Sequence, residues 1–472
     1  MLQATQLTSI FAGGTWIPAS GDRLLEIFDP SNGSIRGEVR SASAADVDTA
    51  CAAAAQAFDA WSRTDPRERA QIVARIAEGL TARSDELADA ITAEVGTPRN
   101  KCAAMQIGPA TTAFASAARL AETVLQDERI DDTVVQKVPV GVVACITPWN
   151  YPLFQIATKL APALVAGCTV VLKPSEVAPT CVAILADICV QAGLPAGVFN
   201  VVFGDGPTTG EALISHPAVD FVSFTGSTRA GARIATVAGA CIKQVSLELG
   251  GKSASLVLPD ADFALAVPQT LAKSFQNSGQ TCAALTRLLV PNSRLDETAA
   301  LLGQHVPSYA VGDPADDRSV LGPVATAEQR AKVRELTTGA RAAGAQLLAC
   351  GPVAGDEYGY YVPAEAYLTG PDDLLSQEEV FGPVLAVIGY SDVDDAVAIA
   401  NNSPYGLSGA VWGADPHHAG SVAARIRTGS IGINGAKTHP DAPFGGFRQS
   451  GFGRERGAHG IDEFLTTRAI HY

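Results

Sequence analysis

The stretch from residue 143 to residue 248 alternates short β-branched runs with longer segments whose apolar residues have helical spacing. The runs predict five strands, at residues 143–147, 169–173, 199–203, 221–224 and 244–248. The segments between them predict helices, at residues 153–166, 179–192, 209–215 and 228–239. Regular alternation of strands and helices is typical of βαβ units, which assemble into parallel sheets. An α/β fold built on a parallel sheet is therefore predicted.

Polar residues and glycines follow every one of these predicted strands. They are Thr147–Asn150, Lys173–Glu176, Gly204–Gly206, Thr225–Ser227 and Glu248–Gly251. Ligands of open parallel sheets bind beyond the carboxyl ends of the strands. A complete Gly-x-Gly-x-x-Gly fingerprint is absent from the sequence, so the prediction of a dinucleotide site rests on the coincidence of these strand ends.

The remaining segments predict further layers around this sheet. Turn residues punctuate residues 9–40, which indicates hairpins. Alanine-rich segments predict helices at residues 44–59, 66–92 and 102–125. A strand at 133–138 is predicted to form an arm that pairs with another subunit. Beyond Cys282, a second α/β region is predicted, with strands near 285–290, 384–389 and 408–412 and a closing strand at 466–472.

Length, charge and cysteine usage narrow the class of protein. A chain of 472 residues is too long for one small core and predicts two or three domains. The net charge of -15 argues against a nucleic-acid partner or an anionic membrane surface. Nine scattered cysteines without a Cys-x-x-Cys pair predict free thiols in the cytoplasm. No signal peptide or membrane span is evident, and the seven histidines lack ligand spacing, so no metal is predicted.

Two segments carry residues suited to covalent chemistry. Phe275–Cys282 places a cysteine after a helical pattern and a Gly-Gln kink, and Leu247–Gly251 places Glu248 at a predicted strand end. A thiol and a carboxylate are the minimum set for forming a thioester and hydrolysing it with activated water. Taken alone, Cys282 would be interpreted as one more buried apolar filler. The chain order of the further segments favours the catalytic interpretation.

The chain resembles the NAD(P)-dependent aldehyde dehydrogenase superfamily over essentially its full length. The segments that carry the resemblance are Thr147–Leu153, Lys173–Glu176, Phe224–Ser227, Glu248–Lys252, Phe275–Cys282, Glu378–Val384 and Pro443–Glu455. The resemblance implies a Rossmann-like cofactor domain, an α/β catalytic domain and a small β oligomerisation arm. The expected boundaries are 1–126 with 141–248 for the NAD-binding domain, 249–445 for the catalytic domain, and 127–140 with 446–472 for the arm and tail.

The resemblance also assigns roles to individual residues. Cys282 is expected to be the nucleophile, and Asn150 is expected to stabilise the oxyanion together with the backbone N–H of Cys282. Glu248 is expected to activate the water that hydrolyses the thioester. Lys159 and Glu455 match a proton-exit relay, although a surface salt bridge or two solvated charges is an equally simple interpretation.

For the cofactor, the resemblance implies NAD, with NADP as an alternative. Glu176 matches a carboxylate that accepts from the adenosine ribose hydroxyls, beside Trp149 and Lys173. Glu379 and Phe381 match the pair that holds the nicotinamide ribose and backs its ring. The complete set of implied cofactor residues is Ile146, Thr147, Pro148, Trp149, Lys173, Ser175, Glu176, Gly206, Gly210, Phe224, Thr225, Gly226, Ser227, Gly231, Leu249, Gly250, Glu379 and Phe381.

The expected partners are a small-molecule aldehyde and further copies of the chain, as a homodimer or homotetramer. Several functions remain as alternatives to a general aldehyde dehydrogenase: a semialdehyde specialist, a catalytically silent structural homologue, and a thiol esterase that uses only Cys282 and Glu248. The presumed substrate-channel stretch, residues 435–441, contains Lys437, His439 and Asp441. No arginine pair near Cys282 is predicted to clamp a carboxylate, and Arg287 is expected to be structural.

Overall fold

The computed structural model describes residues 4–355 and 357–472, so Met1–Gln3 of the predicted first domain and Asp356 of the predicted catalytic domain lie outside the described residues. Its first sheet has a parallel centre in the order β11-β10-β7-β8-β9. The bounds of these strands are β7 Val142–Ile146, β8 Thr169–Lys173, β9 Phe199–Val201, β10 Phe221–Thr225 and β11 Gln244–Glu248. All five predicted strands are present, which confirms the parallel sheet.

Antiparallel strands extend this sheet at both edges. On one side β1 (Ser9–Ala12) pairs with β9 and with β2 (Thr15–Pro18). On the other side β19 (Gly451–Phe452) pairs with β11. The end of the chain thus returns beside Glu248, and it does so within the segment predicted as arm and tail. A separate two-stranded sheet joins β3 (Leu24–Phe28) to β4 (Ile35–Arg40).

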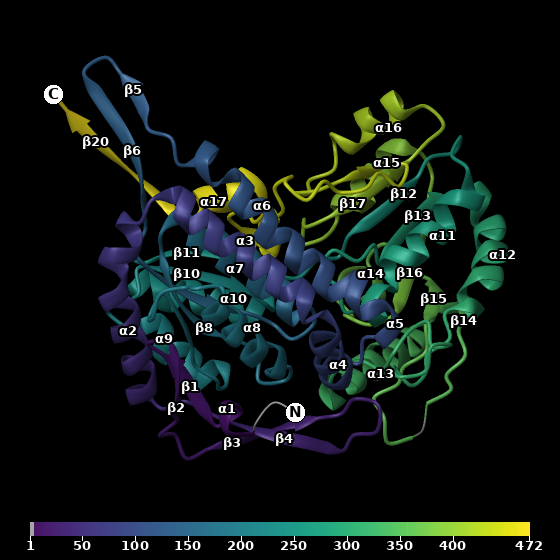
Figure 1. Cartoon of the computed structure of the whole chain (residues 1–472). Helices are drawn as coiled ribbons and strands as arrows, with labels where there is room; N and C mark the ends of the chain where they lie inside the picture. The colour runs from purple at the N-terminus through teal and green to yellow at the C-terminus, as the bar shows by residue number, and fades with distance from the viewer. Residues whose placement is uncertain (1–3, 356) are drawn as a thin grey trace.

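Helices cover both faces of the first sheet (Figure 1). They are α2 Ala44–Arg63, α3 Pro66–Ala82, α4 Ser84–Val95, α5 Arg99–Cys102, α6 Gly108–Val124, α7 Pro152–Ala166, α8 Thr180–Gln191, α9 Glu211–Ser215 and α10 Thr228–Ala240. Of two single-helix predictions, one is wrong and the other is confirmed with a local irregularity. The predicted helix 66–92 breaks at Arg83, whose φ of -105° and ψ of 22° are not helical, and the predicted helix 102–125 contains a π-helical turn over Ala103–Ile107.

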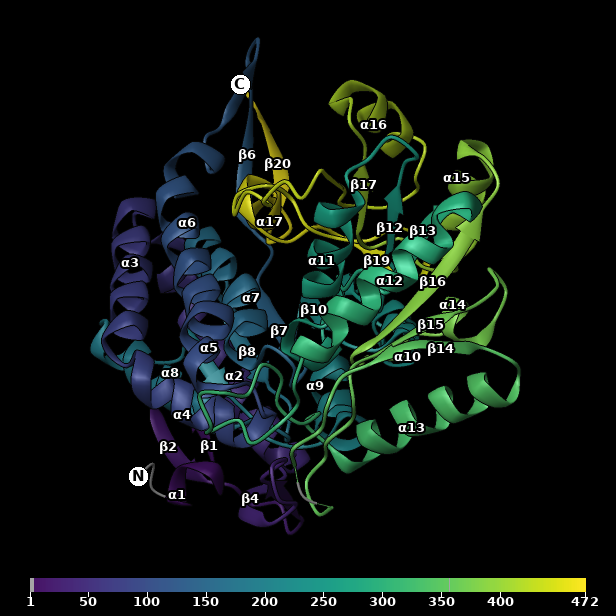
Figure 2. The same cartoon turned by 90° about the vertical axis from the view of Figure 1, so that its right-hand side faces the viewer.

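The second sheet lies in the other lobe, in the order β14-β15-β16-β13-β12-β17-β18 (Figure 2). Its strands are β12 Ala254–Val257, β13 Arg287–Pro291, β14 Gln346–Cys350, β15 Glu365–Leu368, β16 Val384–Tyr390, β17 Gly409–Trp412 and β18 Gly432–Ile433. The main helices of this lobe are α11 Phe263–Ser274, α12 Leu295–His305, α13 Ala327–Ala342, α15 Val393–Asn401 and α16 Pro416–Ala423. Arg287 is buried and donates to the carbonyls of Lys252, Ile399 and Ala400, in line with its predicted structural role.

A third, three-stranded sheet projects from the molecule beside the C-terminus (Figure 1). It consists of β5 (Glu128–Ile130), β6 (Thr133–Pro139) and β20 (Leu465–His471), all antiparallel. The two predicted strands near residues 133 and 466 therefore pair with each other within one chain. Among the described residues, none of the helices has the length and apolar composition needed to cross a membrane.

Candidate active site

Cys282 follows a left-handed turn in the segment that comes after α11. Asn277 and Ser278 have positive φ angles of 52° and 55°, and Gly279 follows at 75°. A Cβ on Gly279 would lie 2.0 Å from the carbonyl oxygen of Gly382, so only glycine fits there. The turn redirects the chain so that the half-buried Cys282 lines a cavity.

Asn150 is fixed next to this turn by a buried amide network. Its Nδ2 donates to the carbonyl oxygen of Gln280 at 2.9 Å. The backbone carbonyl oxygen of Asn150 accepts from Gln106 Nε2 at 3.0 Å and from Asn277 Nδ2 at 2.9 Å. An amide nitrogen carries two N–H groups, so the second one remains for a ligand. Sequence reasoning missed the supporting residues Gln106 and Asn277.

Glu248 ends β11 as a buried carboxyl group, 3% exposed. Neither of its carboxyl oxygens has a hydrogen-bond partner among the described residues. Burial, followed by repulsion from Glu455, raises the pKa of Glu248 well above its ordinary value. A carboxyl group with a raised pKa and free oxygens is suited to accept a proton near neutral pH.

Lys159 and Glu455 form an ion pair in the interior, where side-chain exposures are 1% and 8%. Lys159 Nζ also donates to Thr225 Oγ1 at 2.7 Å, and Thr225 lies opposite Glu248 in the β10–β11 register. The alternative of a surface salt bridge or solvated charges is therefore wrong. The charges of both residues act on Glu248.

Breaking this buried pair is expected to cost far more stability than breaking an exposed one. Lys159→Met leaves Glu455 buried without a counter-charge, and the free energy of unfolding should fall by about 3–5 kcal/mol. Arg63→Met removes one partner of a pair in which both side chains are 77% exposed, and should cost less than about 1 kcal/mol. Urea unfolding of the two variants measures the difference; equal losses would contradict the interior assignment.

The thiol of Cys282 shares this environment. Burial raises its pKa to about 12, and the nearby carboxyl groups of Glu248, Glu379 and Glu455 act in the same direction. Arg456 opposes them. A positive group near a sulfur favours the thiolate, but here its effect on the pKa is smaller than that of burial and the carboxyl groups.

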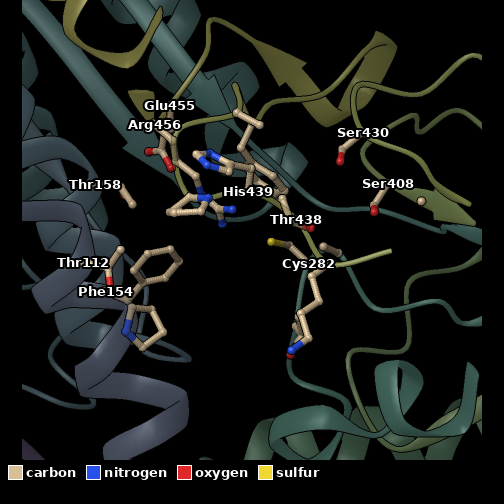
Figure 3. Close-up of a pocket in the computed structure, with 18 of the residues that line it drawn as sticks. Thr112, Phe154, Thr158, Cys282, Ser408, Ser430, Thr438, His439, Glu455 and Arg456 are labelled. Atoms are coloured by element: carbon tan, nitrogen blue, oxygen red, sulfur yellow. The ribbon is translucent and has the colours of Figure 1, made fainter. Parts of the chain in front are cut away.

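The cavity beside Cys282 has a volume of ≈ 840 Å³. Figure 3 shows Thr112, Phe154 and Thr158 on one side, from α6 and α7, and Cys282 with Ser408 and Ser430 on the other. Glu455, Arg456 and His439 enter from the C-terminal part of the chain. A small organic substrate can thus lie against the sulfur while walls from three distant segments surround it.

Arg456 is a residue of this cavity that sequence reasoning missed. Its φ of 72° and ψ of 154° lie in a region almost reserved for glycine, at a cost of about 1–3 kcal/mol. Its guanidinium lies over the rings of Phe154 and Phe444, 5.2 and 4.5 Å from their centroids. The only sequence signal was the charged run Arg454–Arg456, which reads equally well as a solvated surface.

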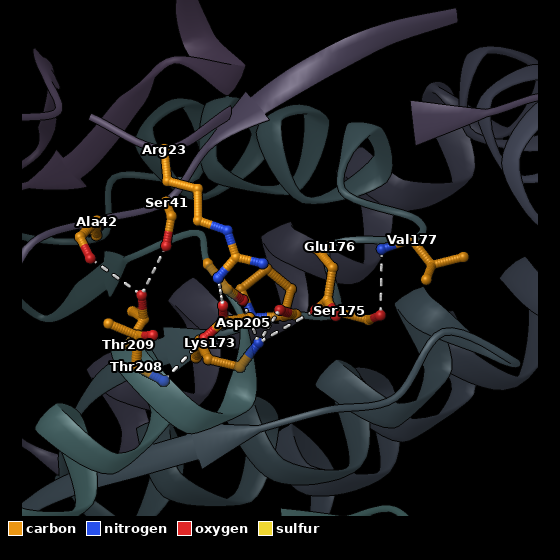
Figure 4. Close-up of polar contacts among 12 residues, drawn as sticks. Arg23, Ser41, Ala42, Lys173, Ser175, Glu176, Val177, Asp205, Thr208 and Thr209 are labelled. Carbon is orange, nitrogen blue, oxygen red and sulfur yellow. Dashed lines mark hydrogen bonds and ion pairs between the residues drawn. The ribbon is translucent and has the colours of Figure 1, made fainter. Parts of the chain in front are cut away.

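A second cluster lies at the end of β8 (Figure 4). Lys173 Nζ donates to the carbonyl oxygens of Pro174 and Gly204 at 2.8 and 2.7 Å, and lies 3.6 Å from Glu176 Oε2. Asp205, which forms an ion pair with Arg23, accepts from the backbone N–H of Thr208. The Arg23–Asp205 pair at this end was not predicted.

Other predicted cofactor residues occupy adjoining turns. Thr147 donates its backbone N–H to Lys173, and Ser175 Oγ accepts from Val177. Gly206 and Gly210 bound a π-helical turn. Ile146, Phe224 and Thr225 lie at the ends of β7 and β10, and Pro148 follows in the loop after β7.

Predicted glycines cluster around the N-terminus of α10. Ser227 caps that helix by accepting from Ala230 N, and Gly226 donates its N–H to the Glu248 carbonyl at 3.0 Å. A Cβ on Gly231 would lie 2.5 Å from Leu249 Cδ2, so a larger residue here would displace the Leu249 side chain. The first N–H groups of a helix and its dipole favour an anionic group here.

The segment that contains Glu379 and Phe381 reaches the same region from the second lobe. Glu379 Oε1 accepts from the backbone N–H of Gly251 at 2.9 Å, next to Gly250. The Phe381 ring lies edge-on to Trp149, with centroids 5.6 Å apart. The structure thus places Trp149 next to Phe381, and Lys173 next to Glu176. Both pairs lie at the carboxyl ends of the strands of the first sheet.

Comparisons with known proteins agree over nearly the full length. A model of the aldehyde dehydrogenase family matches residues 16–470. The 3-succinoylsemialdehyde-pyridine dehydrogenase of a Pseudomonas species is 43% identical over 98% of this chain and 97% of its own. A mutant of aldehyde dehydrogenase C from Pseudomonas syringae, solved with NAD+ and octanal, has a TM-score of 0.97 at 43% identity, covering 99% of this chain and 97% of that one. An aldehyde dehydrogenase from Mycobacterium tuberculosis, complexed with NAD+, has a TM-score of 0.95 at 38% identity, covering 98% of each chain.

Proposed function

Because the chain belongs to the aldehyde dehydrogenase family, we propose that it oxidises an aldehyde to a carboxylic acid through Cys282, with NAD as the hydride acceptor. The observation that carries this proposal is the set of groups around Cys282, which lines the cavity. The amide of Asn150 bonds to Gln280, two residues before Cys282, and the buried carboxyl group of Glu248 has unpartnered oxygens and acts on the Cys282 thiol. The predicted α/β fold class is confirmed by the two sheets and by the structural likeness to aldehyde dehydrogenases.

The residues along the first sheet fit NAD. The capped N-terminus of α10 suits a pyrophosphate, and Glu176 offers a partly exposed carboxylate to ribose hydroxyls. NAD-bound structures of relatives support the same assignment. A 2′-phosphate beside Glu176 would be repelled by its carboxylate, which favours NAD over NADP. When bound, NAD accepts the hydride that leaves the substrate carbon.

The protein residues divide the chemistry between two steps. The Cys282 sulfur adds to the aldehyde carbon, and Asn150 with the backbone N–H of Cys282 holds the developing alkoxide. After oxidation the acyl group remains on the sulfur as a thioester. Glu248 then takes a proton from a water that attacks this thioester, and Lys159 with Glu455 carries the proton away from the interior.

The test is NADH formation followed by absorbance with aliphatic, aromatic and carboxylated aldehydes, with NAD and NADP in parallel. Turnover with NAD supports the proposal. Ester cleavage without any nucleotide, and without oxidation of an aldehyde, would favour the thiol esterase. Folded protein that binds NAD but oxidises none of the aldehydes would favour the silent homologue.

Removing the Asn150 amide tests the oxyanion assignment. Asn150→Ala deletes one preorganised donor, and kcat is expected to fall by about 10²–10³. Steady-state kinetics measure the loss, with thermal unfolding as a control for the buried network around Gln280. An unchanged kcat in a folded variant would remove Asn150 from the mechanism.

The domain division, the assembly and the compartment complete the proposal. The NAD-binding domain comprises residues 1–126 and 141–248, the catalytic domain 249–445, and the arm and tail 127–140 and 446–472.

β5 and β20 are mostly exposed strands at the edges of their sheet, a geometry that favours pairing with a second copy. Light scattering should give a homodimer or homotetramer. All nine cysteines are unpaired, which favours the reducing cytoplasm.

A further inference from the structure

Arg456 has no direct partner for its charge among the described residues. Its guanidinium makes no hydrogen bond or ion pair within the described part of the chain, and its Nε is fully buried without a partner. Glu455, its neighbour in sequence, is paired with Lys159. Burial lowers the pKa of Arg456, and the nearby carboxyl groups of Glu455 and Glu248 oppose this only in part, without a hydrogen bond to the guanidinium. A buried cation without a directly bonded anion is expensive, so its retention points to a ligand that supplies that bond.

The position of Arg456 is defined by two neighbouring elements. Phe444 and Glu455 exchange backbone hydrogen bonds of 2.8 and 2.7 Å, which fixes the Phe444 ring beside the start of α17 (Gly457–Asp462). Phe154, on α7, supplies the second ring. The guanidinium carbon lies over both rings, and none of the N–H groups of this side chain donates to a described residue, so they remain for an acceptor.

The strained backbone supports a functional role. An arginine with φ of 72° and ψ of 154° occupies a conformation that glycine adopts without strain. A side chain retained at such a position is a common feature of ligand sites. Figure 3 shows Arg456 entering the cavity on the side of Phe154 and directed toward Cys282.

We propose that Arg456 binds the distal carboxylate of the substrate, so that the preferred aldehydes are oxo acids that carry a carboxylate at the other end of a short chain. This inference rests on the proposed function and specifies its substrate class. The planar edge of a guanidinium matches a carboxylate with two parallel hydrogen bonds. Arg456 and Cys282 line one cavity and lie close enough for their charges to interact, which favours a short spacer between aldehyde and carboxylate.

The test compares oxo acids with neutral aldehydes of the same chain length. 4-Oxobutanoate is paired with butanal, and 5-oxopentanoate with pentanal, each assayed by NADH formation. The wild-type protein should prefer the oxo acid in kcat/KM. Arg456→Gln should lower the ratio of the two kcat/KM values by about 10- to 100-fold, the contribution of a charge-assisted hydrogen bond, mainly through KM for the oxo acid.

Two variants control the experiment. Arg456→Gly removes the side chain and also the backbone strain, so it should fold at least as well as the wild type and lose the same preference. Lys437→Gln removes one positive charge from the exposed rim of the same cavity, and should change the ratio by less than about threefold because water screens that charge.

Each outcome has a distinct meaning. A wild-type protein that oxidises butanal and 4-oxobutanoate equally well would overturn the inference and leave the proposed function intact. An equal fall of kcat for both substrates in Arg456→Gln, with a shifted pH profile of thioester formation, would also overturn it, because Arg456 would then act on the Cys282 thiol. A wild-type protein that forms no NADH with any aldehyde would instead contradict the proposed function.

Discussion

A Cys282→Ala variant is expected to lose aldehyde oxidation altogether, with kcat falling on the order of 10⁶-fold, as when other enzymes lose their nucleophile. Without the sulfur no covalent adduct forms, and the hydride is never placed on a tetrahedral carbon. The variant should still bind NAD, because the cofactor residues lie on the strand ends of the first sheet. NADH absorbance measures turnover, and quenching of protein fluorescence by NAD measures binding.

The control for this experiment replaces a cysteine that lies on the surface, away from the cavity. Cys241 is exposed at the end of α10, and Cys241→Ala should retain wild-type turnover. Residual oxidation by Cys282→Ala within tenfold of the wild type would show that the chemistry does not pass through this sulfur.

A Glu248→Gln variant is expected to form the thioester but to hydrolyse it slowly. Glutamine cannot take the proton of the attacking water, and loss of a general base costs about 10²–10⁴ in rate. Rapid mixing should show a burst of NADH close to one equivalent per active site, followed by turnover about 10³-fold slower than in the wild type. Absence of the burst, with steady-state turnover equally reduced, would place Glu248 before thioester formation.

The pH dependence follows from the same group. The carboxyl group must be ionised to act as a base, and its pKa is raised by burial and by Glu455. Steady-state turnover limited by hydrolysis should therefore fall as the pH decreases through a value well above that of an ordinary glutamate. In Glu248→Gln this acidic limb should disappear from steady-state turnover. The burst should keep its own dependence on the Cys282 thiol, whose pKa is raised to about 12.

Several features of the fold and of the site could not be predicted, because they arise from contacts between segments that are far apart in the sequence. β12, β14 and β15 were missed because their short runs become strands only beside partners far away in the chain. Lys159 and Glu455 are 296 residues apart, and nothing in either segment indicates that their charges meet in the interior. The environment of Arg456 could not be predicted for the same reason, because its two aromatic neighbours come from α7 and from residue 444.

Other features followed directly from the sequence. The period of apolar residues between 143 and 248 predicted the strands and helices of the first sheet, because burial of one face or one stripe imposes that period locally. Polar residues after each strand then predicted the edge at which the site lies, since parallel strands end together. The resemblance singled out Cys282, Glu248 and Asn150 in the chain order of the family.

The sequence by itself therefore determined the parallel sheet, the family and the residues to examine. The tertiary structure alone decided their environment: the orphaned carboxyl oxygens of Glu248, the amide network around Asn150, and the unpaired guanidinium beside Cys282. The physical reason is that periodicity and turn chemistry act between neighbours along the chain, whereas burial, pKa shifts and charge compensation arise between segments that only the fold brings together.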